Sequence, residues 1–297
     1  MTESGATRVA VYLDFDNIVI SRYDQVHGRT SFHKDKAKGL AKDRLQLATV
    51  EVGAIIDFAS SFGTLVLTRA YADWSADVNS AYHGQLVGRA VDLVQLFPAA
   101  AYGKNGADIR LAVDAVEDMF RLPDLTHVVI VGGDSDYIAL AQRCKRLGRY
   151  VVGIGVAGAT SRSLAAACDE FVTYDALPGI PTVVPQAPEP KSRGRRPSAT
   201  GPDDEPAPDD EPAPADPQAA ATGLLERALR IGQDKDDADW LHNSAVKAQM
   251  KRMDPSFSEK ALGFKSFSDF LRSRSDLVDL DETSTTRLVR LHGDAAP

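Results

Sequence analysis

The 297-residue sequence predicts an α/β protein with a doubly wound parallel sheet, followed by a disordered linker and a small winged-helix domain. Two observations predict the sheet. Short apolar runs alternate with segments of helical period from residue 8 to about 175, and acidic residues follow two of those runs. Strands that are separated by helices pair in parallel, and helices cover both faces of such a sheet.

Four apolar runs are the expected strands of this sheet. They span residues 9–13, 64–68, 128–131 and 150–155. The segments between them have helical period, as in 45–62 and 108–121. Because the ligands of open parallel sheets bind beyond the carboxyl ends of the strands, we expect the functional site at that edge.

The composition indicates a soluble globular protein with enough apolar residues for a sizeable core: 43% are hydrophobic and 26% are charged. No apolar stretch approaches the roughly 20 residues that span a bilayer, and the N-terminus has no signal-peptide pattern, so we expect a cytoplasmic protein without a membrane partner. The net charge of −8 argues against a surface that attracts nucleic acid everywhere. Cys144 and Cys168 have no metal-ligand spacing and are expected as buried thiols.

The first acidic segment is Asp14-Phe15-Asp16-Asn17, at the end of the first apolar run. Asp14 stands where a buried strand emerges, and Asp16 has the same alternating parity. Asn17 can bond a substrate phosphate or cap the next element. A turn or capping role explains Asp14 equally well, because Asp and Asn are favoured in turns for local reasons.

The second acidic segment runs from Lys104 to Asp114. Asn105-Gly106 is a turn signal, so Asp108 falls in the first turn of the following helix and Asp114 comes nearly two turns later. Lys104 can neutralise a phosphate, or it can be an ordinary surface lysine. Asp108 at a helix N-terminus is also explained by the helix dipole without any function.

The third acidic segment is Gly133-Asp134-Ser135-Asp136, between an apolar strand and an apolar helix. The glycines allow a tight turn and the approach of a ligand, and Ser135 can face an anion at the helix N-terminus. Two aspartates at a spacing of two repel each other unless a cation compensates them. Carboxylates from separate strand ends therefore predict a Mg²⁺ or Mn²⁺ site that acts on phosphodiesters.

The chain divides into three parts. Residues 1–180 form the α/β domain, 181–220 a Pro-rich acidic linker, and 221–295 a second domain. The linker has almost nothing to bury and opens with the basic cluster 191–196. The last part has helical period and two strand-like runs, at 277–280 and 287–291, which suggest a winged helix.

The acidic segments resemble the NYN family, a branch of the PIN-like nuclease superfamily. The resemblance covers about residues 8–176 and rests on Asp14-x-x-Asn17, on Lys104-x-x-x-Asp108-x-x-Leu111-x-x-Asp114 and on Gly133-Asp-Ser-Asp-Tyr137. It implies a doubly wound α/β fold, a centre that binds Mg²⁺ or Mn²⁺, and RNA endonuclease activity. By position, the resemblance implies an acidic site of Asp14, Asp108, Asp134 and Asp136, with Asp114 as a further or outer-shell member and Asn17 orienting the substrate. Asp16 would support this site because it shares the parity of Asp14. The three residues between Lys104 and Asp108 exceed the turn that the family often has, which puts Lys104 in doubt.

The C-terminal part is similar to an OST-HTH (LOTUS) domain, a winged-helix module associated with RNA or protein partners. The similarity rests on Trp240 and on the Gly-Phe-x-x-Phe-x-x-Phe-Leu run of residues 263–271. The helical spacing of these aromatics indicates a core. RNA contact would use lysines and an arginine at positions 247, 251, 252, 260 and 265, for which a solvated face is the alternative.

We therefore expect a metal-dependent RNA endonuclease with a C-terminal module that binds RNA or a protein partner. A basic stretch, expected as a loop, would guide the RNA strand, and a solvated surface explains it equally well; it contains Arg29, Lys34, Lys36, Lys38, Lys42 and Arg44. One alternative is an RNA-binding adaptor with weak catalysis. The other is a haloacid-dehalogenase-like phosphatase, because Asp14-Phe15-Asp16 imitates the nucleophile and acid of that group. The RNA target, the choice between RNA and DNA, and the oligomeric state are left open.

Overall fold

The computed structural model describes residues 6–97, 106–181, 216–236, 238–281 and 287–292. The N-terminal domain is built on a 6-stranded sheet of strand order β3-β2-β1-β4-β5-β6. Its strands are β1 (Arg8–Asp14), β2 (Thr64–Ala72), β3 (Asp92–Gln95), β4 (His127–Val131), β5 (Tyr150–Gly155) and β6 (Glu170–Thr173). All neighbouring strands pair in parallel. The predicted doubly wound α/β class is confirmed.

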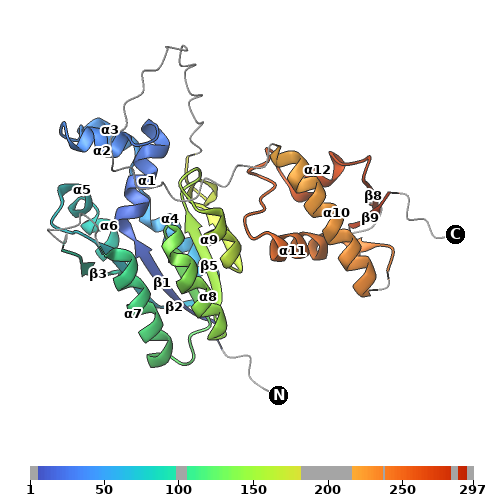
Figure 1. Cartoon of the computed structure of the whole chain (residues 1–297), viewed down its shortest axis with the longest axis horizontal. Coiled ribbons are helices and arrows are strands. Elements are labelled where there is room, and N and C mark those ends of the chain that lie inside the picture. The colour runs from blue at the N-terminus through green and yellow to red at the C-terminus, as the bar shows by residue number, and fades with distance from the viewer. Residues whose placement is uncertain (1–5, 98–105, 182–215, 237, 282–286, 293–297) are drawn as a thin grey trace, which may run out of the picture.

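Helices cover both faces of this sheet (Figure 1). On the way out to the β3 edge the chain forms α1 (Phe15–His27), α2 (Ser31–Lys36), α3 (Lys42–Leu47), α4 (Val52–Ser60), α5 (Asp77–Ser80) and α6 (His83–Val87). On the way back across the sheet it forms α7 (Ala107–Arg121), the 3₁₀ turn η1 (Ser135–Tyr137), α8 (Ile138–Arg146), α9 (Arg162–Ala167) and the 3₁₀ turn η2 (Tyr174–Ala176).

Strand β1 shows why the sheet is buried on both sides. Val9, Val11 and Leu13 belong to the core under α1 and α4, whereas Ala10 and Tyr12 belong to the core under α7, α8 and α9. Successive side chains of a strand point to opposite faces, so a continuous apolar run serves two cores. Cys144 and Cys168 are buried free thiols in the second core, as predicted.

Two features of this domain differ from the sequence prediction. Strands β3 and β6 were not expected, because both are short edge strands of mixed polarity. Residues 45–62, expected as one helical segment, are broken between α3 and α4. The backbone N–H of Val50 donates to the hydroxyl of Tyr82 (3.1 Å) and that of Glu51 to the hydroxyl of Tyr174 (2.7 Å), so tertiary partners replace the helical hydrogen bonds there.

The C-terminal domain combines helices with an antiparallel sheet of order β7-β9-β8, in agreement with the predicted winged helix. Its elements are α10 (Pro217–Asp236), β7 (Leu241–His242), α11 (Asn243–Met253), α12 (Phe267–Arg272), β8 (Val278–Asp281) and β9 (Leu288–Leu291). Helix α10 begins four residues inside the predicted linker, the rest of which lies largely outside the described residues. Phe267 and Phe270 are buried, so the aromatic run forms a core as expected.

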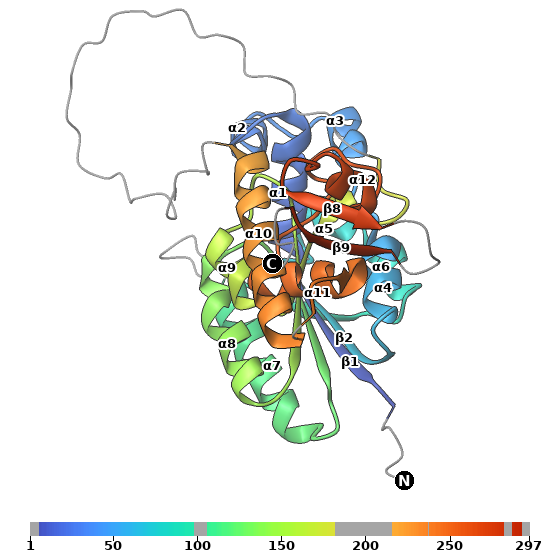
Figure 2. The ribbon, with the colours of Figure 1, turned by 90° about the vertical axis from the view of Figure 1, so that its right-hand side faces the viewer.

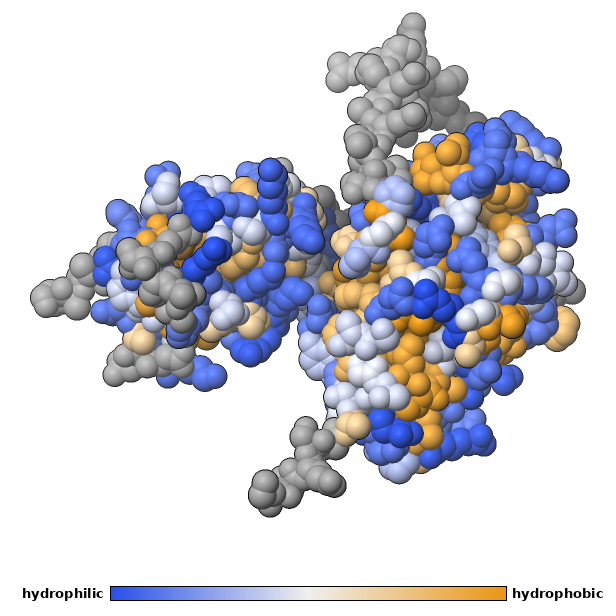
Figure 3. All heavy atoms as spheres, turned by 180° about the vertical axis from the view of Figure 1, so that it is seen from behind, coloured by the Kyte–Doolittle hydropathy of each residue, from blue (hydrophilic) through white to orange (hydrophobic). Residues whose placement is uncertain are grey.

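The surface of the two domains differs. Figure 3, which views the molecule from behind Figure 1, shows hydrophobic patches gathered on the N-terminal domain, whereas the visible face of the C-terminal domain is mostly hydrophilic. Across the described ranges, every helix is too short or too polar to cross a lipid bilayer.

Candidate nuclease site

The strand order places the topological switch point of the sheet between β1 and β4. The chain runs from β1 outward to β3 and then returns to β4 on the other side of β1. Such a reversal is where open α/β sheets bind their ligands, beyond the carboxyl ends of the strands. Asp14 ends β1, and Gly132 to Asp134 follow β4, so the structure brings the first and third acidic segments to this point.

Asp14 is held at the end of β1 by both of its carboxylate oxygens. Oδ1 accepts a hydrogen bond from the backbone N–H of Asn17 (3.1 Å), and Oδ2 accepts one from the hydroxyl of Tyr137 (2.7 Å). The side chain is 7% exposed. The bond to Asn17 caps α1, so the capping role that the sequence allowed is present together with the position at the strand end.

The environment of Asp14 disfavours its charge. Burial raises the pKa of Asp14 to about 6, and the negative charges of Asp16 and Asp134 act in the same direction. The hydrogen bonds from Tyr137 and Asn17 oppose this shift only in part. A carboxylate with a raised pKa beside other carboxylates is an arrangement that a cation would relieve.

Tyr137 donates a hydrogen bond to Asp14, and the charges of two further predicted acids act on its hydroxyl. It is fully buried, and burial, followed by the charge of Asp14, raises the pKa of its hydroxyl above the ordinary value. Asp108 and Asp134 act on the same hydroxyl in the same direction. Asp108 lies in the first turn of α7, behind the left-handed Gly106. The acids of β1, α7 and the β4 loop therefore share one electrostatic neighbourhood.

The β4 loop is shaped by close packing. Asp134 caps η1 by accepting from the backbone N–H of Asp136 (3.1 Å), and Ser135 Oγ lies 3.5 Å from the same carboxylate. Asp134 and Asp136 are exposed. A Cβ on Gly132 would meet the ring of Tyr137 at 3.0 Å and the Cβ of Asp14 at 3.4 Å. Gly132 therefore makes room for the side chains of Tyr137 and Asp14, whereas the sequence had suggested room for a ligand.

Asn17 joins the two strand ends. Its side-chain Oδ1 accepts a hydrogen bond from the backbone N–H of Gly133 (3.0 Å). Because its own backbone N–H donates to Asp14, Asn17 holds the β1 and β4 loops in a common geometry. The substrate-orienting role expected for this side chain stays a prediction.

The two residues expected as supporting acids have other partners. Asp16 accepts from the Asn79 side chain (2.6 Å) and the Asp73 backbone N–H (3.3 Å), which ties α1 to the segment after β2. Asp114 is buried, where it accepts from the hydroxyl of Tyr71 (3.1 Å) and pairs with Arg110 (2.9 Å). Lys104 and the basic cluster 191–196 lie outside the described residues.

Two members of this edge were not predicted from the sequence. Tyr137 was part of the quoted motif, but only the fold shows that its hydroxyl reaches back to β1. Asp73 follows β2, the other neighbour of β1, and its side chain accepts from Ser75 and Gln95. These hydrogen bonds, with a contribution from the charge of Lys36, lower the pKa of Asp73. The sequence signal that could have identified Asp73 is its position directly after an apolar strand.

Basic residues surround the same end of the sheet. Figures 1 and 2 show α2 and α3 beyond the end at which α1 leaves β1. Arg29, Lys34, Lys36, Lys38 and Lys42 are exposed in this segment, whereas Arg44 pairs with Asp35 (3.2 Å).

The basic residues of the C-terminal domain are of two kinds. Lys247 pairs with Glu259 (2.5 Å), and Lys251 pairs with Glu170 of β6 (3.1 Å). Arg252, Lys260 and Lys265 are exposed. The exposed residues are the ones whose position suits the expected contact with RNA.

The donor chemistry of the acidic edge suits a hard divalent cation, because all of the candidate ligands are carboxylates. Among the segments that the structure describes, however, no three or more His, Cys, Asp or Glu side chains lie close enough to hold a metal ion as they stand. Asp134 and Asp136 are exposed at the rim of this edge.

Comparisons with known proteins agree with the two-domain architecture. Residues 8–175 match the model of the NYN domain, and residues 214–290 match that of the OST-HTH/LOTUS domain, which confirms both resemblances. A crystal structure of a protein of unknown function from Vibrio parahaemolyticus is 21% identical and covers 59% of this chain and 98% of its own, with a TM-score of 0.42. No curated protein matches.

Proposed function

Because this chain belongs to the NYN domain family, whose members have a PIN-like nuclease fold, we propose that it is a metal-dependent RNA endonuclease. The observation that carries the proposal is that Asp14 at the end of β1 and the Gly133-Asp134 loop after β4 meet at the switch point of the sheet, joined by the hydrogen bonds of Tyr137 to Asp14 and of Gly133 to Asn17. The OST-HTH domain, a type associated with RNA binding, supports RNA as the substrate. A cytoplasmic location is part of the proposal.

Asp14, Asp108, Asp134 and Asp136 would hold Mg²⁺ or Mn²⁺. Such an ion activates water at neutral pH and stabilises the charge that develops on the phosphate. The protein's own residues prepare the edge for this chemistry. Tyr137 orients Asp14, Asn17 fixes the two loops against each other, and Ser135 lies beside Asp134 at the open rim. A nucleophilic side chain is not required.

The exposed basic residues of α2 and α3 would guide the RNA strand toward the acids. The charge of Lys36 makes a minor contribution to the lowered pKa of Asp73, which supports a position of this segment near the acidic edge. Contacts of this kind neutralise phosphates without reading sequence. The exposed Lys260 and Lys265 would add affinity from the second domain.

The geometry opposes the phosphatase alternative. The residue that would act as the general acid, Asp16, is bonded to Asn79 and to the backbone of Asp73. A phosphoryl group trapped on Asp14 would reverse this conclusion.

Cleavage of single-stranded RNA in the presence of Mg²⁺ or Mn²⁺ tests the proposal. We expect Asp134→Asn to abolish cleavage with little loss of stability, because its side chain is exposed. Asp124→Asn is the matched control. Asp124 makes only an exposed ion pair with Arg8 (2.9 Å) at the opposite end of the sheet. Binding of RNA without cleavage, across varied metals and substrates, would instead establish the adaptor.

A further inference from the structure

Helix α7 has a second apolar stripe besides the one that packs on the sheet. Ile109, Val113, Val116 and Phe120 follow one another at spacings of four, three and four residues. This is the repeat by which one helix packs along another. Ile109 is 68% exposed, Val113 58% and Phe120 70%, whereas Val116 is half-buried and packs against the core beneath the helix. Nothing in the proposed nuclease reaction uses it.

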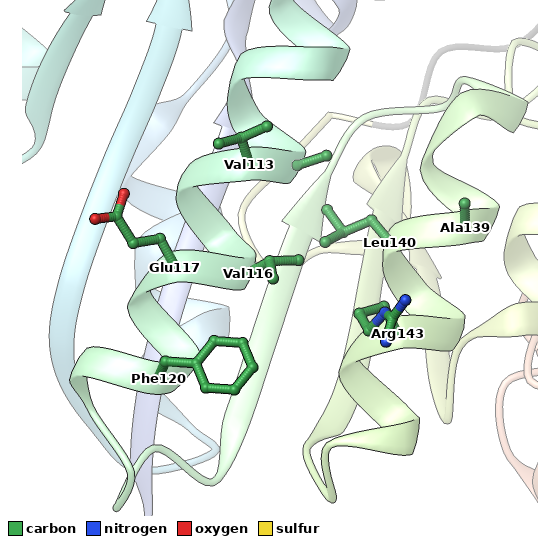
Figure 4. Close-up of a pocket in the computed structure, with 8 residues that line it drawn as sticks. Val113, Val116, Glu117, Phe120, Ala139, Leu140 and Arg143 are labelled. Atoms are coloured by element: carbon green, nitrogen blue, oxygen red, sulfur yellow. The ribbon is translucent and has the colours of Figure 1, made fainter.

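The stripe borders a groove between α7 and α8 with a volume of about 670 Å³. Figure 4 shows Val116 and Phe120 pointing from α7 toward the side of α8 that carries Leu140, with Glu117 on the other side of α7. Soluble proteins seldom leave large apolar side chains contiguous on the surface unless something covers them. An apolar stripe at helical spacing suits a helix as its cover.

Charged residues flank the stripe in a self-complementary way. Arg110 and Glu117 are seven residues apart, so they lie on the same side of α7, two turns from each other. Both border the neighbouring hollow with Ile109 and Val113. Glu117 pairs within the helix with Arg121, and the two side chains are 50% and 70% exposed. Arg110 pairs with Asp114 (2.9 Å), but its side chain is 60% exposed and a guanidinium has further N–H donors for a second carboxylate. The exposed pair of Glu117 with Arg121 is weak enough to exchange for an intermolecular partner.

We propose that a second copy of this chain covers the groove, with its α7 antiparallel to the first around a two-fold axis. In this register Ile109 meets Phe120 of the partner subunit and Val113 meets Val116 of the partner subunit. Arg110 then lies on the same side as Glu117 of the partner subunit, about 3 Å from it along the helix axes, and the same pair forms a second time by symmetry. A two-fold interface requires one patch to complement itself. This patch has one charge of each sign beside an apolar stripe whose spacings, four, three and four residues, are the same in both directions.

Other occupants suit the groove less well. RNA is bound through its phosphates by cations, which an apolar stripe does not supply. The chain's own segment 182–215 has only Val183 and Val184 as large apolar residues, too few to match four stripe positions. The proposed pairing leaves the two Asp108 residues about 20 Å apart along the helix axes, so both acidic edges stay open to substrate.

The mass of the full-length protein in solution tests the pairing. Sedimentation velocity over a wide concentration range should give twice the chain mass of 32.0 kDa. Phe120→Glu and Val113→Glu should each raise the dimer dissociation constant by about 30-fold or more, as for a central interface residue. Leu47→Glu is the matched control, because Leu47 is 68% exposed on α3 and lies outside the groove.

A disulfide trap tests the register. A mixture of the Ile109→Cys and Phe120→Cys proteins should form a crosslinked dimer, whereas neither protein should crosslink with itself, because like residues lie about 16 Å apart along the axis. Self-crosslinking of Ile109→Cys would overturn the antiparallel arrangement. A wild-type protein that is monomeric at all concentrations, or a dimer that Phe120→Glu leaves unchanged, would overturn the proposal. The solution mass and the disulfide crosslink do not depend on RNA cleavage, so failure of the dimer proposal can be told apart from failure of the nuclease proposal.

Discussion

The hydroxyl group of Tyr137 donates a 2.7 Å hydrogen bond to Oδ2 of Asp14, across 123 positions of sequence. This bond joins the loop after β4 to the end of β1, the two strands that flank the switch point. It orients the Asp14 carboxylate, whose ionised form burial disfavours. It is also one of two hydrogen bonds that lower the pKa of Asp14 and so oppose the effect of burial. Several consequences of this relationship can be measured.

Removing the hydroxyl should shift the pH dependence of the proposed reaction. Tyr137→Phe deletes a donor that stabilises the ionised form of Asp14, so the pKa of Asp14 should rise above its present value of about 6. The acid limb of RNA cleavage should then move to higher pH by about one unit. Tyr150→Phe is the control, because Tyr150 begins β5 at the opposite end of the sheet. An unchanged pH profile for Tyr137→Phe would contradict the assigned role.

The stability of the metal-free protein should depend on the ionisation of Asp14. Its folded pKa of about 6 exceeds the ordinary value of 3.8, so folding favours the protonated form. The contribution of Asp14 is therefore fully present below pH 3.8 and is lost as the pH rises through about 6. The loss is on the order of 3 kcal/mol.

Asp14→Asn removes this titration. In urea unfolding with a chelator present, the variant should gain stability relative to wild type as the pH rises from 4 to 7. Added Mn²⁺ should raise the stability of wild type more than that of Asp14→Asn. A stability difference that is constant across this pH range would show that the charge of Asp14 is not the cause.

Asp114 should act in folding rather than in metal binding. Its carboxylate is buried, accepts from Tyr71 and pairs with Arg110. Asp114→Ala should lower the free energy of unfolding by about 1–3 kcal/mol, because it leaves the Tyr71 hydroxyl without its acceptor. Cleavage per folded molecule should remain, in contrast to Asp108→Asn, which should abolish it. Loss of cleavage by folded Asp114→Ala would return Asp114 to the site.

The exposed lysines of the C-terminal domain should contribute to RNA affinity through phosphates. Replacing both Lys260 and Lys265 with Gln should reduce the slope of log affinity against log salt by about 1.4, at about 0.7 for each contact to single-stranded RNA. Lys247→Gln makes the same charge change at a lysine that is already paired with Glu259, so it should alter the slope little. Equal effects of all three lysines would indicate a general electrostatic attraction.

Much of the fold was predictable because it depends on local pattern. The apolar run of residues 9–13 is a strand buried on both faces, and the run of 128–131 is another, since continuous apolar residues suit a sheet with helices on both sides. The acidic residues directly after these runs could be placed at strand ends for the same reason. Strands β3 and β6 escaped prediction because short edge strands of mixed polarity have no such pattern.

Only the tertiary structure decided which of these residues meet. The pairing of β1 with β4 is a contact between distant segments, and it is what sets Asp14 beside Asp134 and under Tyr137. The packing of α7 against β2 likewise directed Asp114 into a buried network with Tyr71. Residue type and spacing determine a strand, a helix and the chemistry available at their ends, but the burial and partners of each carboxylate depend on the packing of elements far apart in the chain.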